Sequence, residues 1–331
     1  MKKIALSVIA ATAVALPIFI GENPYLIGIM ISVLMMAALS SAWNILGGYA
    51  GQYSFGHAAY FGAGAYTTLI LLTLYNSLNP LVCMAMGIVV ASIIALITGS
   101  IVFRLRGHYF GLASIAVAEI VRLSVLNLEF TGGAQGILLS DVSLWGIDLN
   151  SKNPFYYGML LVLVVTLSIS QYLRTSKTGY YLQAIREDQD AAASLGINLA
   201  FYKNKALLIS AALTSILGSL YGLYIRFIDT SAVLDLRLSI EIILTAIIGG
   251  VGTMWGPVVG ALLLVPLAEM LRSNLLGDVL VKAGLVSETS GIGVFLKENL
   301  AHAHVLVYGI ITVLCILYLP KGILGLFRRV K

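Results

Sequence analysis

Uncharged polar side chains gather in one glycine-rich stretch, residues 44–66, which lies between two apolar runs. They are Asn44, Gln52, Ser54 and His57. Amide, hydroxyl and imidazole groups hydrogen-bond to solutes, and glycines allow a helix to unwind where it is buried or lines a cavity. Two interpretations stay open: a broken helix beside a solute pathway, or a tight packing seam whose polar residues are satisfied by hydrogen bonds. His57 alone indicates only a hydrogen-bonded structural histidine.

Two opposite charges occur in a second apolar stretch, where Glu119 and Arg122 stand three residues apart and so share a helix face. Charges within an apolar run are costly unless they face a cavity or a partner group. The two residues either meet a zwitterionic solute or form a structural ion pair, and the pattern favours the ion pair. Arg104 and Arg106, which precede them, are most simply anchors at a helix end.

A third stretch, residues 179–197, is amphipathic and charged. Apolar residues recur in it at spacings of three or four, which predicts a short helix that Gly196 ends. These residues are Leu182, Ile185, Ala192 and Leu195. The charges that crowd one turn are Arg186, Glu187, Asp188 and Asp190. A solvated loop seldom keeps such a stripe, so the pattern favours a helix that docks into a groove of a partner protein.

Glycines at regular spacing predict close helix packing. Gly47 and Gly51 form one pair of small residues four apart, and Gly252, Gly256 and Gly260 fall on one helical ridge.

Motifs for nucleotide binding, metal binding and catalysis are absent from the sequence. It contains no G-x-x-x-x-G-K-[ST], H-E-x-x-H or G-x-S-x-G string and no C-x-x-C pair. We therefore expect no cofactor and no metal on this chain, and no enzymatic activity of its own.

The amino-acid composition indicates whether water or lipid surrounds these segments. Of 331 residues, 59% are hydrophobic and 11% are charged, and the mean hydropathy is +0.96. Soluble domains are about 25% charged. Because a soluble fold cannot bury so much apolar surface, lipid must surround most of it. A soluble enzyme, a disordered chain and a disulfide scaffold are excluded.

Apolar stretches of about 17–25 residues predict an all-α, polytopic membrane protein of about ten transmembrane or re-entrant helices. They cover residues 4–20, 25–46, 57–75, 81–103, 108–126, 156–173, 205–226, 236–250, 256–272 and 304–319. The eighth and ninth are either two crossings or a re-entrant pair. The first resembles a signal peptide, but the apolar run continues past it, and we expect a retained helix.

Charge predicts the orientation. The pieces assigned to the cytoplasm hold 13 of the 20 basic residues and 3 of the 15 acidic ones, so both termini are expected inside. The positive net charge then reflects membrane topology and not a nucleic-acid partner. We expect one membrane domain, residues 1–331, with a cytoplasmic loop at about 174–204 and outer loops at about 127–155 and 273–303.

Several motifs in this order resemble a known family. They are GGYAGQYSFGHAAYFGAGAY, RLRGHYFGLASIAVAEI, TGGAQG, LQAIREDQDAAASLGI, IIGGVGTMWGPVVGALLL and the closing LPKGILGLF. From about residue 25 onward, the chain resembles the inner-membrane permeases of branched-chain amino acid ABC transporters. The R-G-H-Y string and the length make it more similar to the M-type (LivM-like) permease than to the shorter H-type partner.

The resemblance implies a multi-pass subunit of an importer in the inner (plasma) membrane of a bacterium or archaeon. A second permease, of H type, would complete a heterodimer. Two cytosolic ABC ATPase subunits would bind ATP and Mg²⁺, and a periplasmic or extracellular binding protein would deliver substrate. The resemblance assigns ATPase coupling to Ala184, Ile185, Arg186, Glu187, Asp188, Ala192, Leu195 and Gly196.

The expected activity is translocation of branched-chain, hydrophobic amino acids with energy from separate ATPases. Permeases for urea or short-chain amides look similar over the same motifs and stay an alternative. A passive channel and an ion-coupled carrier that depends on Glu119 are other classes, and both would move solute without ATPases. The residues expected along the pathway are Asn44, Gln52, Ser54, His57, Glu119 and Arg122.

Overall fold

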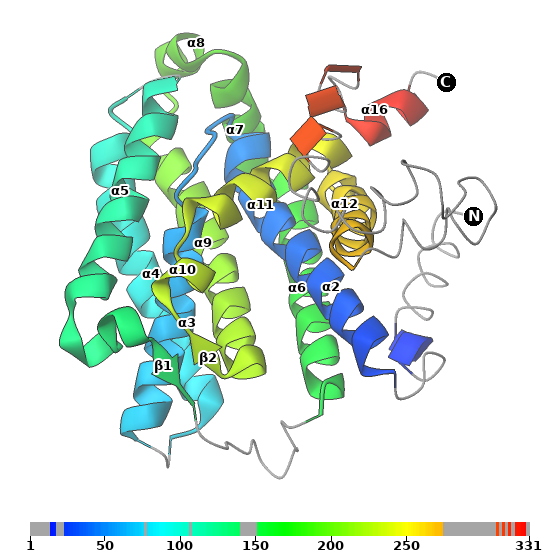
Figure 1. The fold of residues 1–331 in the computed structure, drawn as a ribbon. Helices are drawn as coiled ribbons and strands as arrows, with labels where there is room; N and C mark the ends of the chain where they lie inside the picture. Colours follow the sequence, from blue (N-terminus) through cyan, green and yellow to red (C-terminus); the bar gives the residue numbers. More distant parts are fainter. Residues whose placement is uncertain are drawn as a thin grey trace, which may run out of the picture.

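The fold is a bundle of α-helices, seen in a computed structural model that describes residues 14–17, 23–75, 78–105, 108–139, 151–273, 309–310, 313–314, 317–318 and 322–328. Figure 1 shows the bundle along its length. The helices are α2 (Pro24–Asn44), α3 (His57–Leu74), α4 (Pro80–Val102), α5 (His108–Asn127), α6 (Asn153–Thr175), α7 (Lys177–Glu187), α8 (Gln189–Ser194), α9 (Leu199–Ile225), α10 (Thr230–Val233), α11 (Leu236–Gly249), α12 (Gly256–Arg272) and α16 (Ile323–Arg328).

The remaining elements are short. Residues Ile45–Tyr49 form a π-helical turn, and Glu129–Thr131 and Gly133–Gln135 form 3₁₀ turns. Strands β1 (Ile137–Leu138) and β2 (Phe227–Ile228) pair antiparallel, with Ile137 opposite Ile228. The expected all-α class is therefore nearly complete in the described residues, with a single small ladder.

Five helices among the described residues are long and apolar enough to cross a membrane. They are Pro24–Tyr49, Pro80–Val102, Tyr109–Asn127, Asn153–Thr175 and Leu199–Ile225. The predicted number of about ten spans is not confirmed. Most of the predicted spans 4–20 and 304–319, and all of the predicted outer loop 273–303 except its first residue, lie outside the described residues.

Helix starts follow from local sequence. Asn23 precedes Pro24 and caps α2, accepting hydrogen bonds at its side-chain oxygen from the amides of Tyr25 and Leu26. Asn79 precedes Pro80 and caps α4 in the same way. An asparagine cap satisfies free amides of the first turn, and proline at the first helical position lacks the amide that would be unpaired.

Helix α4 has its large apolar residues outside and its small residues inside, the reverse of a helix in a soluble protein. Its large aliphatic residues at every fourth position are exposed, namely Val89, Ile93, Ile97 and Ile101. Its small residues are buried, including Gly87, Ala91, Ala95 and Gly99. In lipid, small residues let helices approach closely while large apolar ones face the hydrocarbon, so α4 lies at the rim with its small-residue face inward.

The centre of the bundle is the contact between α3 and α9. Gly64 of α3 lies against the main-chain oxygen of Ser215, and Gly218 of α9 lies against that of Phe61. Thr68 also donates a hydrogen bond of 2.9 Å to Ser219 across this contact. Glycine on both helices permits the close approach.

Helices α11 and α12 form a hairpin. With 14 residues at about 1.5 Å each, α11 is about 21 Å long, short of the roughly 30 Å hydrocarbon core. The predicted span 236–250 is therefore not a full crossing by α11 alone. Gly249 and Gly256 meet at the turn, and Gly260 packs against the main-chain oxygen of Thr245.

The two ends of the bundle differ. Figure 1 shows α7, α8 and α16 toward one end and the β1–β2 ladder toward the other. The predicted cytoplasmic loop thus lies opposite the described part of the predicted outer loop, which contains left-handed Gly132, Gly133 and Gly136.

Candidate functional site

A helix is interrupted where the glycine-rich stretch was identified. Helix α2 ends at Asn44 and passes into the π-helical turn Ile45–Tyr49, and regular helix resumes only at His57. Gly51 takes a left-handed φ of 67° in the segment between them. Non-helical backbone at membrane depth must be buried in protein or line a cavity, and here the π-helical turn is buried throughout.

Asn44 ties this interruption to the turn between α11 and α12. Its side-chain nitrogen donates to the main-chain oxygen of Thr253 at 2.9 Å, and its side-chain oxygen accepts from the amide of Gly252 at 2.8 Å. Both ends of the amide are used, so Asn44 acts here as a bridge between two irregular segments.

His57 joins α3 to α9. Its Nε2 lies 2.8 Å from the hydroxyl of Ser210, which donates to the main-chain oxygen of Ala42 at 2.7 Å. The amide of the next residue, Ala58, donates to the Ser239 hydroxyl of α11 at 2.9 Å. The imidazole is fully buried, and its Nε2 is hydrogen-bonded.

The other two predicted pathway residues of this stretch are also buried. The main-chain oxygen of Ser54 accepts from the Trp43 indole at 2.8 Å, and Gln52 donates to the main-chain oxygen of Ala50 at 3.2 Å. Each of the four residues is thus hydrogen-bonded within the bundle, to partners outside the group. A role of these residues in translocation stays a prediction.

The predicted amphipathic helix is two helices, α7 and α8, because Asp188 ends one and caps the next. Asp188 adopts an extended conformation and accepts hydrogen bonds from the amides of Asp190 at 2.8 Å and Ala191 at 3.0 Å. A carboxylate that caps two amides competes with continued helix. Gly196 has a φ of 81° and ends α8.

Three of the four residues of the expected apolar stripe are buried and the fourth is exposed. Leu182, Ile185 and Ala192 are buried against the bundle, whereas Leu195 is 81% exposed. The stripe therefore holds the two helices onto this chain, and Leu195 is the apolar residue left for another surface.

Both helices are attached to the bundle by cations. Arg186 of α7 donates from Nη1 to the main-chain oxygen of Gly48 in the π-helical turn at 2.7 Å. Lys203 of α9 donates to the side-chain oxygen of Gln189 in α8 at 2.8 Å. The Arg186 side chain also lies against Gly51 and Gly252. Arg186, expected on the docking surface, thus reaches into the bundle.

The predicted packing glycines have separate roles. Gly47 lies beneath the Trp43 ring, and Gly51 faces α7. Gly252 has a φ of 76° and lies in the turn before α12. Of the three glycines predicted to share one helical ridge, only Gly256 and Gly260 therefore lie in a helix.

Glu119 and Arg122 pair with each other on α5. Arg122 donates from Nε and Nη2 to the two carboxylate oxygens, at 2.9 and 2.6 Å. Their side chains are 44% and 29% exposed. This is the ion-pair geometry predicted as one of two interpretations.

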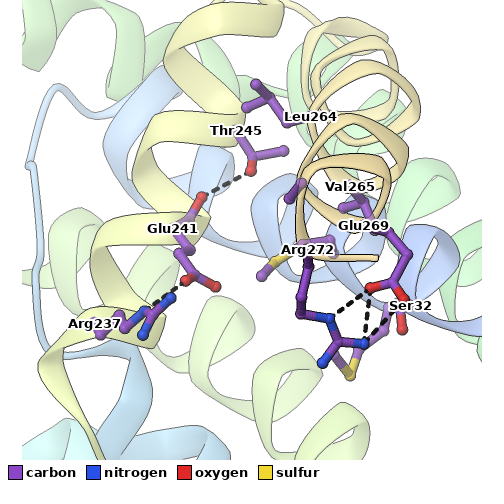
Figure 2. A pocket seen from close by; sticks show the side chains of 11 residues that line it. Ser32, Arg237, Glu241, Thr245, Leu264, Val265, Glu269 and Arg272 are labelled. Carbon is purple, nitrogen blue, oxygen red and sulfur yellow. Dashed lines mark hydrogen bonds and ion pairs between the residues drawn. The ribbon is translucent and has the colours of Figure 1, made fainter. Parts of the chain in front are cut away.

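A cavity between α2, α11 and α12 is lined by four charged side chains (Figure 2). The sequence alone did not indicate that these four belong together. This charged cavity has a volume of about 310 Å³ and is defined by Ser32, Arg237, Glu241, Glu269 and Arg272. Arg237 pairs with Glu241 on α11 at 3.0 Å, and Arg272 pairs with Glu269 on α12 at 2.8 Å. Figure 2 shows the two pairs on opposite sides of the cavity.

The sequence indicates each of the two ion pairs but not the cavity that they share. Arg237 and Glu241 stand four apart, and Glu269 and Arg272 three apart, each pair within a mostly apolar helix. Only folding places the two pairs, some thirty residues apart in sequence, around one space. Within the described residues no cluster of His, Cys, Asp or Glu side chains is placed to hold a metal ion.

Five helices long and apolar enough to cross a bilayer, with a helical path interrupted in the interior, are features of a membrane-integral protein. The chain belongs to the family described as branched-chain amino acid transport system, permease component, which matches residues 25–314.

Curated relatives agree with this membership. The LivM permease protein of Salmonella typhimurium is 26% identical over 310 residues, which cover 86% of this chain and 72% of the relative. The probable LivM protein of Methanocaldococcus jannaschii is 24% identical, with 86% and 89% covered. The LivH permease protein of Escherichia coli is 23% identical, with 72% and 81% covered. No solved structure matches this chain.

Proposed function

We propose that this chain is the membrane-spanning subunit of an ATP-driven importer that carries branched-chain amino acids across the inner membrane of a bacterium or archaeon. ATP hydrolysis takes place on separate ATPase subunits, since the sequence has no nucleotide-binding loop. A second permease resembling LivH completes the pathway, and a binding protein outside the membrane delivers the substrate. Similarity of this chain to both LivM and LivH proteins supports a pair of related permeases.

The observation that carries the proposal is the position and attachment of α7 and α8. The two helices lie at one end of the bundle (Figure 1), and Leu195 at their tip is exposed. The hydrogen bonds of Arg186 and Lys203 join them to the π-helical turn and to α9. A partner that moves α7 and α8 would therefore move the interrupted helix, which is the mechanical link that a separate motor needs.

Two apolar depressions on the bundle provide surfaces that further membrane subunits or lipid would cover. One is lined by α4, α6 and α9, with a volume of about 820 Å³, and the other by α2, α6 and α12, with about 680 Å³. Extended apolar surface of this kind faces either hydrocarbon or another membrane helix.

The test is reconstitution of the chain, alone and with the subunits that co-purify with it, in liposomes. The proposal expects uptake of labelled L-leucine only by the complete assembly and only with ATP. Uptake by the chain alone would identify a passive channel and overturn the proposal. Uptake of urea in preference to leucine would establish the alternative, a urea or short-chain amide permease.

A further inference from the structure

We propose that the charged cavity binds the charged ends of a zwitterionic amino acid during translocation. The inference rests on the proposed function, because it names the site at which the transported amino acid is recognised. The carboxylate of the solute would meet Arg237 and Arg272, and its ammonium group would meet Glu241 and Glu269.

The balance of charge in the cavity fits such a solute. Two guanidinium groups and two carboxylates line the same space, so the cavity offers both signs and no net charge. Arginine binds a carboxylate through two parallel N–H groups, and a carboxylate accepts hydrogen bonds from an ammonium group. A solute with one charge of each sign has a partner for both ends.

The exposure of the four side chains leaves them accessible. Arg237 and Arg272 are 68% and 67% exposed, whereas Glu241 and Glu269 are 33% and 19% exposed. Glu269 is held further by the hydroxyl of Tyr25, which donates to it at 3.2 Å. The carboxylates are thus fixed in the wall, and the guanidinium groups extend from it.

A purely structural role explains the arrangement less well. Each of these pairs lies within a single helix, so neither joins α11 to α12, and both pairs border the same space. Ionisable groups in membrane-embedded helices face cavities and mark solute pathways. A second cavity of about 330 Å³ is also lined by Met35, Met36, Arg237 and Glu241, and Asp235 adds a further carboxylate there.

The same space offers an apolar wall for the side chain of the solute. Met35 and Met36 of α2 and Leu264 and Val265 of α12 also line the charged cavity. Methionine adapts its shape to different apolar groups, which suits a set of branched aliphatic side chains. Urea carries neither net-charged ends nor an apolar group and would leave both kinds of lining without a partner.

The first test measures leucine uptake by the complete transporter with Glu241→Gln or Glu269→Gln. Each change keeps the shape of the side chain and removes its charge, and we expect the KM for L-leucine to rise about tenfold or more, as for loss of a charged hydrogen bond. The matched control is Glu129→Gln, the same change at an exposed carboxylate in the 3₁₀ turn Glu129–Thr131. An unchanged KM in both cavity variants overturns the inference.

A second measurement does not depend on transport or on these charges. Ser32→Cys is introduced into the otherwise complete assembly with Cys83→Ala and Cys315→Ala, and its reaction with a water-soluble maleimide is followed. We expect excess L-leucine to slow labelling severalfold and excess urea to leave it unchanged. Equal labelling with and without leucine overturns the inference even if the Gln variants fail to assemble.

The experiments can disprove this inference without disproving the proposed function. If the unmodified assembly imports leucine with ATP while Ser32→Cys is not protected and the KM is unchanged in the Gln variants, the inference alone is wrong. If the unmodified assembly imports no leucine, the proposed function itself is wrong.

Discussion

Arg186 donates a hydrogen bond of 2.7 Å from Nη1 to the main-chain oxygen of Gly48, 138 residues earlier in the chain. The bond joins α7 to the π-helical turn that interrupts the helical path from α2 to α3. In the same place Asn44 bonds the amide of Gly252, so the α11–α12 turn belongs to this junction. One cation therefore connects an exposed helix with two irregular segments of the interior.

Arg186→Ala is predicted to separate assembly from transport. The side chain points into the bundle, so ATPase subunits should still co-purify, whereas ATP-driven leucine uptake should fall about tenfold for loss of a charged hydrogen bond. Arg186→Lys keeps a donor and should retain part of the uptake. The measurement is ATPase co-purification beside uptake. Full uptake in the Ala variant would contradict a mechanical role for this bond.

Leu195→Ser is predicted to have the opposite effect, loss of assembly. Leu195 is 81% exposed at the end of α8, and burial of a leucine side chain is worth roughly 1.5–3 kcal/mol. Affinity of the chain for the ATPase subunits should therefore fall about tenfold or more. The neighbouring exposed Ser194→Ala is the control. Equal affinity of the two variants would move the docking surface away from Leu195.

The helical elements follow largely from the sequence because the apolar runs set their lengths. The predicted span 81–103 is α4, Pro80–Val102, and the predicted span 108–126 is α5, His108–Asn127. The break after Asn44 also agrees with the glycine-rich stretch, since glycine and polar groups mark where a helix can be interrupted.

The charged cavity did not follow from the sequence. Glu241 and Glu269 each have a local arginine partner, so each pair is satisfied within its own helix and carries no sign of the other. Their common cavity depends on how α11 and α12 fold back and on where α2 lies, which are tertiary relationships. Likewise, the spacing of Leu182, Ile185 and Ala192 predicts one continuous helix, because apolar periodicity does not indicate that Asp188 ends one helix and caps the next.

Asp188→Ala is predicted to loosen α8 specifically. The variant loses the cap that accepts from Asp190 and Ala191, at a cost of about 1 kcal/mol. Those two amides should exchange hydrogen about fivefold faster, since that energy is a factor of about five in a local equilibrium. Asp188→Asn keeps an acceptor and should restore most protection. Glu187→Ala, one residue outside the cap, should leave both amides protected.

Gly64→Ala is predicted to disrupt the α3–α9 contact at the centre of the bundle. A methyl group there would overlap the main-chain oxygen of Ser215, which belongs to a helix and cannot rotate away. Overpacking of this kind costs typically 1–3 kcal/mol. In Gly158→Ala on α6, the methyl group would meet only Leu220 at 3.6 Å, an ordinary contact, and helix propensity should stabilise the protein by about 0.5–1 kcal/mol. Thermal unfolding in detergent compares the two variants. Because both exchanges are identical in chemistry, a Tm for Gly64→Ala equal to or above that of Gly158→Ala would contradict the close packing of α3 on α9.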